Sequence, residues 1–198
     1  VLFRSFGVGV DFAISKADSA NRTSFSIAGK DTNNILHFVD QRVGRMDTTE
    51  IIDAFFEIQN SWNPDVFWVE DGVIWKAIYP VLLSEMRRRD VYLNLTALLP
   101  VKDKKVRGRS LQKRMRAHGC KFNKKAEWYD GFESELLRFT GNSEAMLDDQ
   151  FDSAAWVCRG FENYIVEDDD ALTPEEEEFN HVSSQLRGGS GRSAVTGY

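Results

Sequence analysis

The sequence predicts one α/β domain, built on a mixed five-stranded sheet with helices on its flanks. Two observations predict this class: three short β-prone segments follow one another near the N-terminus, and strand-like and helix-like segments then alternate. With 198 residues, 42% of them apolar, the chain is long enough to bury one core. No apolar run approaches the roughly 18 residues that a membrane span needs, so we expect no membrane partner.

The first three expected strands form an antiparallel meander. Residues 6–14 (FGVGVDFAI) are apolar and β-prone around a single charge, which is typical of a central strand. Residues 23–28 and 35–39 predict two shorter strands, joined by the turn-prone segment 29–34. We expect the three strands to pair in chain order.

A helix and a fourth strand follow the meander. Asp47 and Glu50 have the spacing of a helix capping box, and apolar side chains recur on one face of the segment after them until residues 63–64. Residues 65–70 (DVFWVE) predict the fourth strand. For the rest of the domain we expect a fifth strand over 91–95 and helices over 74–89, 108–118, 127–139 and 148–161.

Composition changes at the end of the chain. Nine acids and no Lys or Arg lie between residues 162 and 178, and a Gly/Ser-rich run follows. Like-charge blocks and Gly/Ser-rich runs do not pack into a core. We therefore expect a domain over residues 1–165 and an acidic, then Gly/Ser-rich, mobile tail over 166–198. Because the first residue is Val, we also expect a piece of a longer protein.

Charge is distributed unevenly along the chain. The formal net charge of −6 alone argues against a nucleic-acid partner, yet residues 102–125 carry eleven Lys or Arg and one acid. Such density is typical of a surface that contacts a phosphate backbone, although a merely solvated basic helix is the alternative. The candidates for DNA contact are Lys102, Lys104, Lys105, Arg107, Arg109, Lys113, Arg114 and Arg116.

Cysteine and histidine are scarce. Cys120 and Cys158 are too few for a disulfide framework, so a reducing compartment is expected. Three histidines without a C-x-x-C pair argue against a zinc site.

Carboxylates occur where the sequence predicts buried structure. Asp11 lies within an apolar strand, where an unpaired charge costs several kcal/mol, and Glu70 ends another apolar strand. Asp149 and Asp152 open the last helix three residues apart, so they share a face. Each acid alone fits a turn, a strand end or a helix cap. Together, and beside a basic segment, they predict a site.

The donor set points to hard metal ions. Carboxylate oxygens without His or Cys suit Mg²⁺ or Mn²⁺. Two such ions can flank a phosphodiester, one activating water and the other stabilising the leaving oxygen. The sequence therefore predicts metal-dependent phosphodiester hydrolysis.

Four short motifs occur in a fixed order: G-V-D-x-A at Gly9–Ala13, V-E at Val69–Glu70, K-x-R at Lys105–Arg107 and D-D-x-x-D-S-A at Asp148–Ala154. In this order they resemble the C-terminal nuclease domain of the large terminase subunit of tailed phages. That family has an RNase H-like, resolvase-like fold. The resemblance covers residues 6–163.

The resemblance implies an endonuclease that cuts concatemeric viral double-stranded DNA in the host cytoplasm during packaging, with little sequence preference. It also implies as partners an N-terminal packaging ATPase domain, the small terminase subunit and the portal. By position, Asp11, Glu70 and Asp149 match the catalytic, metal-binding acids. Accessory candidates are Asp148, Asp152 and Asp18.

The chain departs from the family pattern at two positions. Phe12 stands where a small residue or Pro is commoner, and Leu147 stands where a His usually precedes the paired Asp. The second departure leaves open which paired acid is the ligand. We expect Asp149 rather than Asp148, because Asp149 has a same-face partner in Asp152. No G-x-x-x-x-G-K-[ST] motif occurs, so the ATPase half is not expected within this chain.

Three other functions compete with this prediction. A Holliday-junction resolvase or a transposase-like nuclease of the same superfamily would differ in its preferred substrate. A sugar-kinase or actin-like ATPase would need a glycine-rich loop after the first strand, and residues 15–18 (SKAD) supply none. A catalytically inactive DNA-binding or docking module is the alternative of another class, and the presence of all three acid clusters argues against it.

Overall fold

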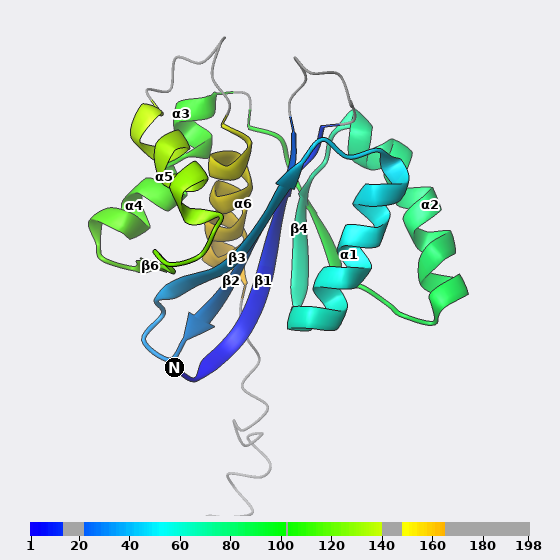
Figure 1. Ribbon diagram of the computed structural model, residues 1–198, viewed down its shortest axis with the longest axis horizontal. Helices are drawn as coiled ribbons and strands as arrows, with labels where there is room; N and C mark the ends of the chain where they lie inside the picture. Colours follow the sequence, from blue (N-terminus) through cyan, green and yellow to red (C-terminus); the bar gives the residue numbers. More distant parts are fainter. Residues whose placement is uncertain (14–21, 102, 140–147, 165–198) are drawn as a thin grey trace, which may run out of the picture. The chain divides into compact units, whose positions relative to one another are not determined.

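A six-stranded mixed sheet with helices on both faces forms the domain (Figure 1). The computed structural model describes residues 1–13, 22–101, 103–139 and 148–164, without the side chain of Lys104. The sheet has the order β5-β4-β1-β2-β3-β6. Its strands are β1 (Phe3–Asp11), β2 (Thr23–Asp31), β3 (Leu36–Gly44), β4 (Val66–Glu70), β5 (Leu95–Leu98) and β6 (Cys120–Phe122). The helices are α1 (Thr48–Trp62), α2 (Val73–Arg89), α3 (Lys104–Arg107), α4 (Arg109–Arg116), α5 (Tyr129–Arg138) and α6 (Asp149–Asn163).

The antiparallel meander is confirmed, with longer strands than predicted. β1 pairs with β2 and β2 with β3, both antiparallel. The turn between β2 and β3 is closed by the Asp31 carboxylate, which accepts the backbone N–H groups of Asn33 and Ile35 at 2.9 Å each. The predicted strand over 6–14 is shifted: β1 begins at Phe3 and ends at Asp11. The charge therefore lies at the end of the strand and not in its middle.

The first helix begins and ends as the sequence predicts. Asp47 Oδ1 accepts the Glu50 backbone N–H at 2.9 Å, and Glu50 Oε2 accepts the Asp47 N–H at 2.8 Å, which completes the capping box. At the other end Asn63 has a left-handed φ of 42° and caps the helix. Strand β4 then runs parallel to β1, and β5 runs parallel to β4.

Two predictions about the sheet are wrong. The fifth strand covers Leu95–Leu98 and not 91–95, because Leu93 turns into the core and pairing with β4 begins only at Leu95. The prediction also missed β6, a three-residue strand parallel to β3, so the sheet has six strands and not five. Three residues are too short a run to show a period of two.

The basic segment folds as two helices, where one was predicted over 108–118. Gly108 separates α3 from α4. A Cβ built at Gly108 would lie 2.6 Å from Cζ of Phe151, so a larger residue would push this segment away from α6. Helix α4 ends near Ala117, and His118 has a left-handed φ of 55° before Gly119.

Two clusters of buried apolar side chains fill the two faces of the sheet. Phe67 and Val69 belong to the cluster with α1 and α2, whereas Val66 and Trp68 belong to the cluster with α4, α5 and α6. This alternation along β4 is the one that a strand buried on both faces requires. Figure 1 shows α1 and α2 on one side of the sheet and α4, α5 and α6 on the other.

The chain beyond the domain lies outside the described residues. Residues 1–164 form one compact unit, and the predicted tail over 166–198 belongs to the part that is not described. Among the described helices, none is both long and apolar enough to cross a bilayer.

Helix α6 lies so close to β1 that only glycine fits at position 9. A Cβ built at Gly9 would overlap the carbonyl oxygen of Ser153 and lie 2.7 Å from the backbone nitrogen of Val157. These are backbone atoms, so the whole helix would have to move to make room.

We therefore expect Gly9→Ala to destabilise the domain by about 1–3 kcal/mol through overpacking. Urea denaturation followed by tryptophan fluorescence measures this. Gly44→Ala is the matched control, because a Cβ there has its nearest neighbour at 3.5 Å, in the flexible Met46 side chain. Equal losses of stability in the two variants would contradict the packing argument.

Candidate active site

The ends of two parallel strands bring two predicted acids together. Val10 of β1 pairs with Val69 of β4, so the next residue of each strand, Asp11 and Glu70, ends at the same edge of the sheet. Both side chains are partly buried.

Helix α6 adds two further carboxylates. Asp149 and Asp152 lie in its first turn and are only 3% and 4% exposed. Burial raises the pKa of the Asp11 carboxyl well above its usual value, and the charges of Asp152, Asp149 and Glu70 raise it further, while Arg107 opposes them. Asp11, Glu70, Asp149 and Asp152 are called the acidic site below.

A buried polar network holds α6 against the sheet. The Ser153 hydroxyl donates to the Gln150 carbonyl at 3.0 Å and lies within hydrogen-bond distance of Ser24 (2.9 Å) and Ser26 (2.7 Å) on β2. Gln41 on β3 donates to the Ser26 hydroxyl at 3.0 Å and accepts from the Gln150 amide at 2.7 Å. Hydrogen bonds to three elements thus fix the rotation of α6 about its axis.

A second set of contacts fixes the first turn of α6. Glu135 of α5 is buried, and its Oε2 accepts the backbone N–H groups of Gln150 (2.8 Å) and Phe151 (3.3 Å). Its other oxygen accepts from the Arg22 guanidinium, whose Nε donates to Asp149 at 3.1 Å. Burial raises the pKa of Glu135, and Arg22 together with the two N–H groups opposes that rise. Glu135 therefore caps α6 from a neighbouring helix, and Arg22 connects this cap to Asp149.

Arg107 lies within the acidic site and not on an outer DNA-binding surface. Its Nη1 is 3.0 Å from Asp152 Oδ2 and 3.9 Å from Glu70 Oε2, and its side chain is 12% exposed. The guanidinium thus lies between an acid of the helix and an acid of the sheet.

The donor chemistry of the acidic site fits Mg²⁺ or Mn²⁺. The donors are carboxylate oxygens, which both ions prefer, and the mutual repulsion that raises the pKa of Asp11 would be relieved by a divalent cation. Across the described ranges, no three acidic, His or Cys side chains are close enough together to hold a metal ion. Two of the acids are bound to arginines instead, Asp152 to Arg107 and Asp149 to Arg22.

The accessory candidates are placed differently from one another. Asp148 is at the N-cap position of α6, where its carbonyl oxygen accepts the Asp152 N–H at 2.8 Å. Asp152 belongs to the acidic site, which gives it a larger part than the sequence predicted. Asp18 is outside the described residues.

The predicted DNA-contacting residues do not share one surface. A cavity of about 610 Å³ is bordered by Lys105, Arg109 and Arg116, with apolar side chains from α4, α5 and α6 in its lining. Lys113 and Arg114 line another cavity beside the β2–β3 turn, where Arg114 donates to the Asn34 carbonyl at 3.0 Å. Lys102 and the Lys104 side chain are not described.

Sequence reasoning missed Arg22, Glu135 and the buried serines. Ser24 and Ser26 alternate with apolar residues, a pattern typical of a solvent-facing side, yet both serines are fully buried under α6. Glu135 did leave a signal: it follows Phe132 by three residues, so a carboxylate shares the buried face of α5.

Comparison with solved structures identifies the fold. The nuclease of the large terminase from the thermophilic phage G20c, with bound magnesium, superposes with a TM-score of 0.56 at 15% identity, covering 78% of this chain and 80% of that one. The large terminase of a second thermophilic bacteriophage gives 0.55 at 11% identity, covering 79% of this chain. The fold is the RNase H-like fold of large terminase nucleases.

The same comparisons bound what is shared. This chain spans 40% of the second phage's large terminase. The fowlpox virus resolvase in complex with Holliday junction DNA has a TM-score of 0.48 at 15% identity, covering 80% of this chain and 99% of that one. No family model and no curated protein sequence matches the chain.

Replacing Glu135 tests whether it fixes the start of α6. We expect Glu135→Ala to lower the free energy of unfolding by about 1–3 kcal/mol, because two backbone N–H groups and Arg22 lose a buried acceptor. Asp130→Ala, an exposed acid on the same helix, is the control in a denaturant titration. If the two variants are equally stable, Glu135 is not the cap described above.

Proposed function

We propose that this chain is a divalent-metal-dependent endonuclease that cuts double-stranded viral DNA during genome packaging. The observation that carries the proposal is the convergence of four carboxylates at one edge of a sheet with the large terminase nuclease fold. The similar G20c nuclease has bound magnesium, which supports the same metal class here.

Asp11 and Glu70 from the sheet, with Asp149 and Asp152 from α6, would hold the metal. Two bound ions supply activation of water and stabilisation of the leaving oxygen of a phosphodiester. The chain itself supplies rigid placement: strand pairing fixes the first two acids, and the Ser153 network fixes the last two. Such preorganisation lets the acids act without rearranging during the reaction.

The basic border of the cavity beside α6 is the proposed DNA contact. Lys105, Arg109 and Arg116 lie on α3 and α4, the elements that also carry Arg107 to the acidic site. Lys and Arg that bind phosphate contribute affinity without base recognition, so we expect cleavage with little sequence preference.

The packaging role extends beyond this chain. The chain spans 40% of the second phage's large terminase, and we propose that a packaging ATPase domain accompanies it in the whole protein. The small terminase subunit, the portal and the host cytoplasm complete the proposal, by resemblance to the family.

Metal-dependent cleavage is the direct test. We expect the purified chain to nick and linearise plasmid DNA with Mn²⁺ and to stop when EDTA is added. Asp11→Asn should reduce cleavage to background and raise the melting temperature of the metal-free protein, because it removes one of several like charges from a buried site.

Asp130→Asn, on the exposed side of α5, is the control for that experiment. Undiminished nicking by Asp11→Asn would refute the site. Comparison of linear duplex with a four-way junction separates the packaging nuclease from a junction resolvase, which would cut the junction preferentially.

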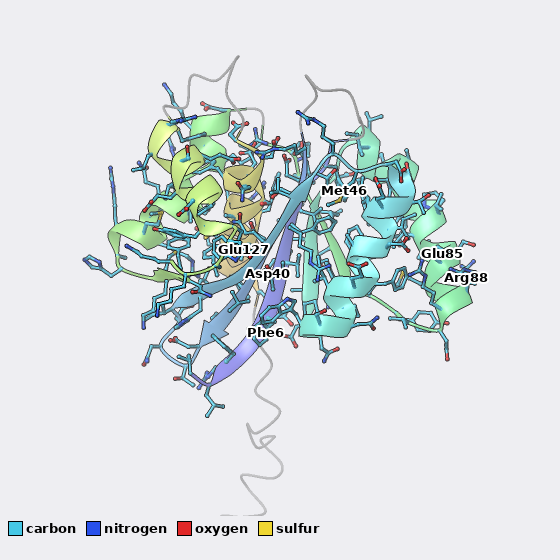
Figure 2. All side chains as sticks on the ribbon, in the orientation of Figure 1. Phe6, Asp40, Met46, Glu85, Arg88 and Glu127 are labelled. Atoms are coloured by element: carbon cyan, nitrogen blue, oxygen red, sulfur yellow. The ribbon has the colours of Figure 1, made fainter. Side chains whose placement is uncertain are left out.

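The DNA-contact surface has a separate test. We expect the double variant Lys105→Ala/Arg109→Ala to lower the log–log salt slope of DNA binding by about 0.9 per lost phosphate contact. The control is Arg87→Ala/Arg88→Ala at the end of α2, where Arg88 pairs with Glu85 at 2.6 Å (Figure 2). An unchanged slope in the first variant would place the DNA on another face.

A further inference from the structure

The backbone around Arg107 is held in place from both sides. The Asp103 carboxylate accepts the Lys105 backbone N–H at 2.8 Å, and the Asp103 carbonyl accepts the Arg107 N–H at 3.0 Å. On the other side, Gly108 packs directly against the Phe151 ring of α6. Arg107 therefore reaches the acidic site from a fixed position and not from a loose surface loop.

The guanidinium of Arg107 lies where a metal ion would have to bind. It is 3.0 Å from Asp152 and 3.9 Å from Glu70, and its positive charge also acts on Asp11. Its Nε is buried and has no hydrogen-bond partner among the described residues. The contacts of this arginine are thus electrostatic contacts with the acids, centred on one bond to Asp152.

We propose that Arg107 is the built-in counter-cation of the metal-free site and competes with the divalent metal for the carboxylates. The inference rests on the proposed metal-dependent function. An Asp152 oxygen that binds a guanidinium is not available to a metal ion, and two cations among the same acids repel each other. Metal binding therefore displaces Arg107, and this exchange sets the metal affinity of the site.

A purely supporting role would have the opposite sign. If Arg107 only orients Asp152 for the metal, its removal weakens metal binding because the ligand loses its position. If Arg107 competes, its removal strengthens metal binding, because the site becomes more negative and no ion pair must be broken first. The direction of the change decides between the two roles.

Calorimetric titration with Mn²⁺ on Arg107→Gln is the experiment. We expect the Mn²⁺ Kd to fall by at least about fivefold, the lower end of typical coupling between two ligands. The metal-free variant should melt below the wild type, and Mn²⁺ should raise its melting temperature by more than it raises that of the wild type. Arg107→Met, which keeps the apolar stem without the charge, replaces the Gln variant if the latter does not fold.

Arg109→Gln is the matched control, since it removes the same charge two residues away on an exposed side chain. Its Mn²⁺ Kd should equal that of the wild type. An unchanged or higher Kd in the folded Arg107 variants overturns the competition while leaving a metal site in place. No Mn²⁺ binding by either wild type or variants overturns the proposed function as well. Binding by the variants alone supports competition in its strongest form.

Discussion

The close contact between helix α6 and strands β1 and β2 determines where the acids of this domain lie. Gly9 leaves room for the Ser153 carbonyl, and the Ser153 hydroxyl meets Ser24 and Ser26 on the next strand. This contact sets both the height and the rotation of the helix on the sheet. The first turn of α6 is therefore held beside the ends of β1 and β4, and the acids of three elements meet there because the backbone leaves them no other place.

Such a meeting of carboxylates is unfavourable on its own, and two arginines offset it. Arg22 binds Asp149 and the buried Glu135, which also caps α6, so this arginine is part of the support of the helix. Arg107 instead lies between the helix acid and the sheet acid. The raised pKa of Asp11 shows that burial and the neighbouring carboxylates outweigh this compensation. A site with unrelieved negative charge and oxygen donors is suited to a divalent cation.

Local patterns were enough to predict the meander, the capped helix α1 and the acids at the ends of β1 and β4, because each depends on a few adjacent residues. The acids could be assigned to one edge because parallel strands end together. The edge strand β6 is only three residues long, and β5 begins where pairing with β4 allows, so neither boundary is encoded locally. Arg107 had the composition of a DNA contact, and only the packing of Gly108 on Phe151 shows that it faces the acids. The Arg22 contact spans more than a hundred residues, beyond any local pattern.

The central claim is that the acidic site binds divalent metal. The most direct measurement is a crystal structure of the chain grown with Mn²⁺, with diffraction data collected to locate manganese by anomalous scattering. The account predicts manganese between Asp11, Glu70 and the first turn of α6, with the Arg107 guanidinium moved away from Asp152. Manganese at other places only, or a well-ordered acidic site without it at saturating Mn²⁺, would contradict the account.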